Sequence, residues 1–262
     1  MRTAAFFARS SLFARAWRAL RRRGPFGFIR LSLYNLRLFA TGQVKNHRYI
    51  YDQAFDVEHG VDTLGVVEVD EMEVPDHLKR GAARYEAAEP ELVDFLIARA
   101  GALLLRDQTF IDIGSGKGRV VLMAAMAGFR RVIGVELDRD LHRIACKNVE
   151  VARPRFPAAD IMLVNEDASQ FAFPTCPAIC FVNNPFDDQV LERLLENLRR
   201  SLAEAPRNFM LVYAHSIHAD ALRHAEEWEE LDKGTFRSPR HPFAIFQWRG
   251  SSSSSRAAGV AA

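Results

Sequence analysis

Residues 109–118 read TFIDIGSGKG, a short apolar segment that runs directly into a glycine-rich turn. The first five residues have the character of a buried strand, and residues 119–127 have the apolar spacing of a helix. Gly114, Gly116 and Gly118 let the backbone turn tightly and approach a ligand closely, while the first turn of the helix offers free N–H groups. A strand, a glycine turn and a helix in this order are typical of sites for nucleotide-like ligands.

The spacing within the turn narrows the class of ligand. The glycines follow GxGxG, whereas dinucleotide-binding proteins have GxGxxG. Asp112 stands just before them, where a carboxylate repels a pyrophosphate but suits an ammonium, such as the amino group of a methionine moiety. Lys117 does not make the turn a P-loop, because the pattern GxxxxGK[ST] is absent. The sequence therefore predicts a ligand that carries a cation beside Asp112.

Strands and helices alternate along the rest of the chain. The apolar pattern predicts strands over 109–113, 131–136, 161–165, 178–182 and 208–213, and helices over 89–105, 119–127, 139–151, 189–203 and 219–225. Two final strands, 228–236 and 243–248, are joined by a connection too short for a parallel crossover. We therefore expect an α/β fold, a doubly wound, seven-stranded and mostly parallel sheet with an antiparallel last strand.

Two carboxylates after the next strands are candidates for the same site. Glu136 lies about 20 residues after the glycine turn, where a carboxylate accepts hydrogen bonds from both ribose hydroxyls and disfavours a phosphorylated ribose. Asp167 follows the third strand and can accept from an adenine amino group, with Leu137 and Ala168 flanking the ring. The alternative roles are an N-cap or surface carboxylate for Glu136 and a turn or N-cap aspartate for Asp167.

The tetrad Asn183-Asn184-Pro185-Phe186 follows the fourth strand, at the carboxyl edge where open α/β sheets bind ligands. Two asparagines and a proline can form a plain turn, but their position beside three ligand motifs favours a functional role. His215 and His218 follow the fifth strand and can reach the rim of the same cleft. Ordinary surface or core histidines are the favoured interpretation for both.

The span from about Tyr85 to Trp248 resembles a class I S-adenosylmethionine-dependent methyltransferase of the Rossmann-like type. DIGSGKG is similar to that family's first motif, Glu136 to its ribose-binding acid, Glu166-Asp167-Ala168 to its adenine motif, and the final strand pair to its reversed last strand. The resemblance implies S-adenosylmethionine as cofactor. The cofactor-binding residues that we expect are Tyr85, Asp112, Gly114, Ser115, Gly116, Gly118, Glu136, Leu137, Asp167 and Ala168.

The tetrad resembles the Asn-Pro-Pro-Tyr sequence of amino-group methyltransferases, with Asn184 in place of a proline and Phe186 in place of the tyrosine. It implies that Asn183, Asn184, Pro185 and Phe186 are the catalytic residues of an in-line transfer to an amino or amide nitrogen. The side-chain carbonyl of Asn183 and a neighbouring backbone carbonyl would accept hydrogen bonds from the N–H groups of the amine. The ring of Phe186 would flank the cationic centre. The acceptor is expected to be a protein, such as a protein lysine, or a small molecule.

A closer resemblance and a looser one concern the substrate. Residues 55–63, which include Gly60-Val61-Asp62-Thr63, and Arg84-Tyr85 are like a bacterial group of predicted methyltransferases of unknown substrate. Lysine methyltransferases related to the histone and mitochondrial enzymes share a similar glycine motif. An NAD-dependent oxidoreductase, a non-catalytic cofactor-binding scaffold and a nucleic-acid methyltransferase are the rival functions. The GxGxG spacing and Asp112 argue against the first, and the lack of a recognition module argues against the last.

The N-terminus differs in charge from the rest of the chain. It has eleven Arg and Lys residues and no acidic residue before Asp52, with apolar residues at near-helical spacing among them. We expect a basic amphipathic extension over 1–51, a lead-in segment and cofactor lid over 52–88, the methyltransferase domain over 89–249 and a disordered serine-rich tail over 250–262. The extension is a solvated or packed segment, a contact for an anionic membrane surface or nucleic acid, or a targeting peptide.

Compartment and metal content follow from two further observations. No apolar run approaches the ~18 residues that span a bilayer, so we expect no transmembrane helix. The three cysteines, Cys146, Cys176 and Cys180, form no CxxC pair, which argues against both a disulfide framework and a zinc site. The expected location is cytoplasmic, with peripheral membrane contact as an option, and no metal site is expected.

Overall fold

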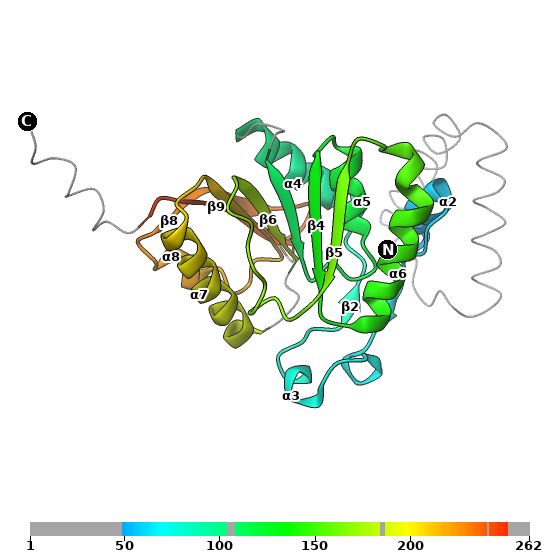
Figure 1. Ribbon diagram of the computed structural model, residues 1–262, viewed down its shortest axis with the longest axis horizontal. Helices are drawn as coiled ribbons and strands as arrows, with labels where there is room; N and C mark the ends of the chain where they lie inside the picture. The colour runs from blue at the N-terminus through cyan, green and yellow to red at the C-terminus, as the bar shows by residue number, and fades with distance from the viewer. Residues whose placement is uncertain (1–48, 104–107, 184–186, 240, 251–262) are drawn as a thin grey trace, which may run out of the picture. The chain divides into compact units, whose positions relative to one another are not determined.

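The computed structural model describes residues 49–103, 108–183, 187–239 and 241–250, and the chain divides into two compact units, Met1–His59 and Gly60–Ala262 (Figure 1). In the first unit the described element is α2 (Tyr49–His59), in which the rings of Phe55 and His59 meet edge to face at 4.6 Å between centroids. The basic residues 1–48 and the tail 251–262 lie outside the described residues. The predictions about them and about the three boundaries between the four predicted segments stay predictions.

Seven strands of the second unit form one sheet in the order β5-β4-β3-β6-β7-β9-β8. Their bounds are β3 (Thr109–Ile113), β4 (Arg131–Glu136), β5 (Asp160–Asn165), β6 (Ala178–Val182), β7 (Phe209–Ala214), β8 (Trp228–Thr235) and β9 (Pro242–Trp248). The first five pair in parallel, and β9 lies antiparallel between β7 and β8. The sheet order reverses between β3 and β6. The doubly wound, mostly parallel sheet with an antiparallel last strand is therefore confirmed.

Helices cover both faces of this sheet: α4 (Pro90–Leu103), α5 (Arg119–Met126), α6 (Arg139–Ala152), α7 (Asp188–Glu204) and α8 (Asp220–Arg223), with the 3-10 turn η2 (Arg153–Arg155) after α6. Figure 1 shows α7 and α8 together on one side of the sheet and α5 and α6 on the other. Asp138 caps α6 by accepting from the Leu141 N–H, and Asp187 caps α7 by accepting from the Val190 N–H.

The central strands are buried on both faces. Every residue of β3, β6 and β7 is buried, and one continuous core cluster joins Ile111, Cys180 and Leu211 of these strands to Leu194 and Leu198 of α7. Strands enclosed in this way read as unbroken apolar runs, because both faces must leave water. This burial explains why the sequence predicts β3, β4 and β6 with their observed bounds.

Residues 60–88, here called the strap, precede this domain in sequence and contain four short elements. They are β1 (Val66–Val67), η1 (Val69–Glu71), α3 (Asp76–Lys79) and β2 (Tyr85–Glu86), and β1 pairs antiparallel with β2. Met72 and Val74 are buried in a second apolar cluster with Leu141 of α6, and Leu137 and Tyr85 pack against that cluster. The strap therefore has its own apolar contact with the domain, beside the residue that follows Glu136.

Most element bounds differ from the sequence prediction by one or two residues, and two of the differences have local reasons. The helix expected over 219–225 is shorter, because the Trp228 N–H donates to the Ala225 carbonyl and turns the chain into β8. The strand expected over 208–213 extends to Ala214, which pairs with Phe243 of β9.

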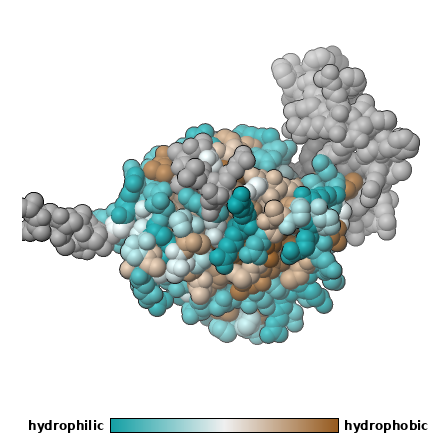
Figure 2. Space-filling model, turned by 45° about the horizontal axis from the view of Figure 1, so that its top comes forward, coloured by the Kyte–Doolittle hydropathy of each residue, from teal (hydrophilic) through white to brown (hydrophobic). Residues whose placement is uncertain are grey.

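In the face shown in Figure 2, apolar residues lie among hydrophilic ones. None of the helices that the structure describes has the length and apolar character of a membrane-spanning segment.

Candidate functional site

The glycine turn lies at the point where the sheet order reverses. β3 is flanked by β4 on one side and β6 on the other, so the turn that leaves β3 opens into the crevice at the carboxyl edge of the sheet. Gly114, Gly116 and Gly118 have φ values of 72°, 54° and 85°, which only glycine adopts readily. The N–H groups of Gly114 and Ser115 donate to the Val135 carbonyl at 2.9 and 3.0 Å. The loop is therefore fixed against β4 before any ligand is bound.

Asp112 lies beneath this loop with 2% of its surface exposed. Burial, and after it the Glu136 carboxylate, raise the pKa of Asp112 well above its usual range. Within the described part of the chain, Oδ2 of Asp112 and the neighbouring Oγ of Ser115 are buried without a hydrogen-bond partner. Buried polar atoms are almost always paired in folded proteins, so these two atoms suit a polar ligand. A cationic ligand group would also restore the charge of Asp112.

Glu136, at the end of β4, connects the glycine loop to the next turn. Its Oε2 accepts from the Gly116 N–H at 2.6 Å and its Oε1 from the Asp138 N–H at 2.8 Å. Burial raises the pKa of Glu136 to about 7, although these backbone donors oppose the shift. The Leu137 N–H also bonds this carboxylate. An ionised carboxylate has about four acceptor positions, so one or two remain for the hydroxyls of a ribose.

The predicted adenine residues lie at the neighbouring strand ends. Asp167 accepts the Ser169 N–H at 2.9 Å through Oδ1, so the turn role weighed for it is present in the structure. Ala168 is buried in the core, and Leu137 is held in place because Asn165 Nδ2 donates to the carbonyls of Glu136 and Leu137. The adenine role of Asp167, Leu137 and Ala168 stays a prediction.

Tyr85, in β2 of the strap, lies directly on the glycine loop. Its hydroxyl donates to the Thr63 carbonyl, and a Cβ placed on Gly116 would collide with its ring. The second glycine of the loop therefore makes room for Tyr85 as well as for a ligand. These contacts suit a packing role as well as a cover over the cofactor, so the cofactor-binding role of Tyr85 stays a prediction.

Three buried polar side chains anchor the strap to the domain, and the sequence analysis assigned none of them a role. Lys117 Nζ donates to Asp62 Oδ1 at 3.0 Å and to the Leu64 carbonyl at 2.8 Å. Asn148 of α6 bonds both the N–H and the carbonyl of Asp62. Arg119, which is 2% exposed, donates to Thr63 Oγ1 and to the Ala88 carbonyl. The sequence offered one signal for these anchors: Lys117 and Arg119 stand at the N-terminus of a predicted helix. Positive charge is unfavourable there, so both side chains need acidic or carbonyl partners.

We expect Lys117→Met to loosen the strap without unfolding the domain. Methionine keeps the apolar stem and removes both hydrogen bonds, so amide hydrogen exchange at residues 62–64 should become about tenfold faster and S-adenosylmethionine affinity should fall by roughly three- to tenfold. Mass spectrometry of exchange and calorimetry measure the two effects. Lys147→Met, which alters an exposed lysine of α6, is the control. Equal exchange rates in the two variants would contradict this role for Lys117.

Of the four tetrad residues, Asn183 is the one that the structure describes. Asn183 follows β6 and its Oδ1 lies 2.8 Å from Nδ1 of His215, the residue that follows β7, so the structure brings His215 to the predicted acceptor side. Asn184, Pro185 and Phe186 lie outside the described residues. His218 is half-buried in the same loop, and its backbone bonds the Tyr213 hydroxyl. The contact between Asn183 and His215 joins residues 32 apart in the chain, which no sequence pattern indicates.

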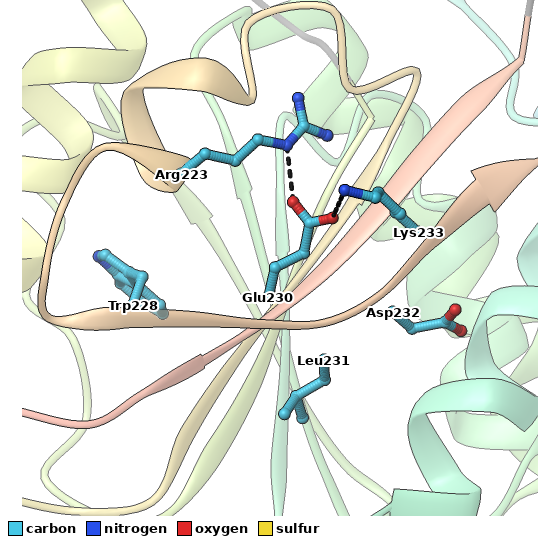
Figure 3. Close-up of a pocket in the computed structure, with 6 residues that line it drawn as sticks. All are labelled: Arg223, Trp228, Glu230, Leu231, Asp232 and Lys233. Carbon is cyan, nitrogen blue, oxygen red and sulfur yellow. Dashed lines mark hydrogen bonds and ion pairs between the residues drawn. The ribbon is translucent and has the colours of Figure 1, made fainter.

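A separate hollow of about 600 Å³ lies along the edge strand β8 (Figure 3). It is lined by Arg223, Trp228, Glu230, Leu231, Asp232 and Lys233. Glu230 points toward both cations and pairs with Arg223 at 2.6 Å and with Lys233 at 3.0 Å. The charge of Glu230 is thus compensated by its two partners. Because β6, β7 and β9 separate β8 from β3 in the sheet, this hollow is remote from the glycine loop, and we do not place the cofactor there.

The reversed sheet order, the glycine loop and the two buried carboxylates define an α/β domain of the class I methyltransferase fold. Residues 110–205 match the family model described as a methyltransferase domain. The chain thus contains a class I methyltransferase domain, a class whose cofactor is S-adenosylmethionine. No curated protein matches the sequence.

Solved structures of methyltransferases are similar to this chain at low sequence identity. A putative methyltransferase from Escherichia coli is 18% identical over 62% of this chain and 86% of its own, with a TM-score of 0.46. Magnesium protoporphyrin IX methyltransferase from Synechocystis with bound S-adenosylmethionine is 17% identical over 62% and 79%, with a TM-score of 0.44. The methyltransferase domain of a bacterial Hen1 protein is 12% identical over 62% and 98%, with a TM-score of 0.49.

Proposed function

We propose that this chain transfers a methyl group from S-adenosylmethionine to an amino or amide nitrogen of a protein or small-molecule acceptor. The observation that carries the proposal is the pair of buried carboxylates, Asp112 and Glu136, on either side of the glycine loop at the reversal of the sheet. Asp112 has an oxygen without a partner in the described part of the chain, and Glu136 keeps one or two acceptor positions. An amino group and a ribose diol supply the matching donors.

The cofactor residues follow from this arrangement. In the proposal Asp112 binds the ammonium of the methionine moiety, Glu136 binds the ribose hydroxyls, and the main chain of the glycine loop with Ser115 Oγ lines the path between them. Asp167 accepts from the adenine amino group. The remaining proposed contacts are Gly114, Gly116, Gly118, Leu137 and Ala168 around the cofactor, with Tyr85 above it.

Catalysis in this proposal depends on alignment. When bound, the cofactor supplies an electrophilic methyl group and leaves as a neutral thioether, while the acceptor nitrogen gains the methyl and releases one proton to water. The protein has to hold the nitrogen lone pair in line with the methyl and exclude water, which lowers a barrier by several kcal/mol. We assign the acceptor side to Asn183 and to the residues that follow it in the tetrad, Asn184, Pro185 and Phe186.

Calorimetric titration with S-adenosylmethionine and with NAD tests the proposal. We expect micromolar binding of S-adenosylmethionine, no binding of NAD, and a loss of at least about tenfold in Glu136→Ala, because the ribose hydroxyls lose a charged acceptor. Glu150→Ala, an exposed carboxylate of α6, is the matched control. Binding of NAD alone would indicate an oxidoreductase. Binding of neither ligand would overturn the proposed function.

A second measurement separates an enzyme from a scaffold. Labelled S-adenosylmethionine incubated with amine-containing small molecules and with protein extracts should transfer the label to a nitrogen that resists base hydrolysis, unlike a methyl ester. Tight cofactor binding without transfer to any acceptor would favour the scaffold.

A further inference from the structure

The carboxyl ends of β6 and β7 bring an amide and an imidazole together. Asn183 follows β6 and His215 follows β7, and these strands pair in parallel up to Val182 and Tyr213. The distance from Asn183 Oδ1 to His215 Nδ1 is 2.8 Å. An amide oxygen can only accept, so Nδ1 of His215 carries the proton in this contact.

The backbone of His215 is held in an unusual conformation. Its φ is +50°, in the left-handed region that only a few per cent of residues other than glycine occupy, with asparagine, aspartate and histidine the most frequent among them. The following loop is tied down by the Ser216 N–H, which donates to the Pro242 carbonyl, and by the Ile217 N–H, which donates to the carbonyl of His215. Such a conformation persists where its surroundings determine it, and it is common at functional sites.

Two further groups enclose the imidazole. The ring of His241, in the turn before β9, meets the ring of His215 edge to face at 5.1 Å between centroids. His241 Nδ1 lies 3.9 Å from Glu89 Oε2, just before α4. Because β9 is antiparallel to β7, its first residues lie at the same sheet edge as the end of β7. Contacts thus run from Asn183 to His215, from His215 to His241 and from His241 to Glu89. Together they limit the movement of His215.

We propose that His215 is a positioning residue for the methyl acceptor, which fixes the Asn183 amide so that its oxygen faces the acceptor nitrogen. This inference rests on the proposed function and refines its acceptor side. Oδ1 has two lone pairs; the Nδ1–H of His215 occupies one and leaves the other for an N–H of the acceptor. Without the imidazole, the amide can rotate by half a turn and present its NH₂ group, which repels an amine N–H.

The test uses two cofactor analogues, so that it does not depend on the natural acceptor. S-adenosylhomocysteine lacks the methyl group, and sinefungin carries an ammonium-bearing carbon in place of the methylsulfonium. The ratio of their dissociation constants therefore reports acceptor oxygens near the position of the transferred methyl. We expect wild type to favour sinefungin and the ratio to fall by about five- to tenfold in Asn183→Ala and in His215→Gly, the value of one hydrogen bond.

The replacements at residue 215 separate positioning from folding. Glycine tolerates the left-handed backbone, so His215→Gly removes only the ring. Asparagine also tolerates it and can donate from Nδ2, so His215→Asn should regain part of the ratio. His218→Ala, in the same loop, should leave the ratio unchanged. An unchanged ratio in His215→Gly, or an equal fall in His218→Ala, would overturn the inference while the proposed function stands. If wild type bound neither analogue, both would fail.

Ring-nitrogen NMR shifts give a second, independent measurement. His215 should carry its proton on Nδ1 in the wild type and should lose this preference in Asn183→Ala. A neutral ring protonated only on Nε2 in the wild type would contradict the contact from which the inference starts.

Discussion

Asp112→Asn is expected to raise the melting temperature of the cofactor-free protein and to weaken S-adenosylmethionine binding at the same time. Burial, and then Glu136, raise the pKa of Asp112 well above its usual range. Unfolding lets this carboxyl lose its proton to water, which favours the unfolded state at every pH above its ordinary pKa. Asparagine has nearly the same shape and no proton to lose. We therefore expect the melting temperature to rise by a few degrees, since about 1 kcal/mol of stability corresponds to roughly 2–4 °C in a domain of this size.

The loss of affinity has a separate cause. In the proposed complex the Asp112 carboxylate faces an ammonium in a buried site, and hydrogen bonds between charged groups contribute about 1.5–3 kcal/mol. A neutral amide should therefore weaken binding on the order of 50-fold. Thermal unfolding at pH 7.5 and calorimetry measure the two effects, with the exposed Asp160→Asn as control. A variant that binds as tightly as wild type would show that Asp112 does not contact the cofactor.

The parallel sheet could be predicted from sequence because its strands are buried on both faces. β3, β4 and β6 are continuous apolar runs bounded by turns, and α6 and α7 begin at aspartate caps that the sequence displays. Asp112 and Glu136 could be predicted for a related reason. Each stands where a strand ends, so the alternation of elements alone places both at one edge of the sheet.

The anchors of the strap could not be predicted in the same way. Lys117 and Asp62 are 55 residues apart, and Asn148 and Asp62 are 86 apart. A lysine between two glycines indicates a phosphate ligand at least as readily as a structural ion pair. The small sheet of β1 and β2 has two residues in each strand, too few to show a periodic pattern. Contacts of this kind depend on the completed fold, because neither partner has a local preference that marks it.

Our final prediction concerns the effect of pH on cofactor affinity. Burial raises the pKa of Glu136 to about 7 in the cofactor-free protein. Two ribose hydroxyls need the ionised carboxylate, since a bound proton occupies one of its acceptor positions. Cofactor binding should therefore expel a proton whenever the pH is below about 7, and affinity should fall as the pH falls. The Glu136 proton alone should raise the dissociation constant roughly 25-fold between pH 7.5 and 5.5, and the proton that Asp112 loses when it binds the ammonium should make the fall in wild-type affinity steeper still.

The cofactor's own titration has little effect over this range, because an α-amino group with a pKa of about 7.7–8.0 is mostly protonated at pH 7.5 and fully protonated at pH 5.5. Calorimetry in buffers of different ionisation enthalpy would count the released protons directly. Asp112→Asn should bind weakly but keep the step near pH 7, whereas Glu136→Ala should lose that step. If wild-type affinity were constant over this range, or rose toward acid pH, the raised pKa of Glu136 would have no part in binding, and the ribose would have to be held by main-chain groups of the glycine loop instead.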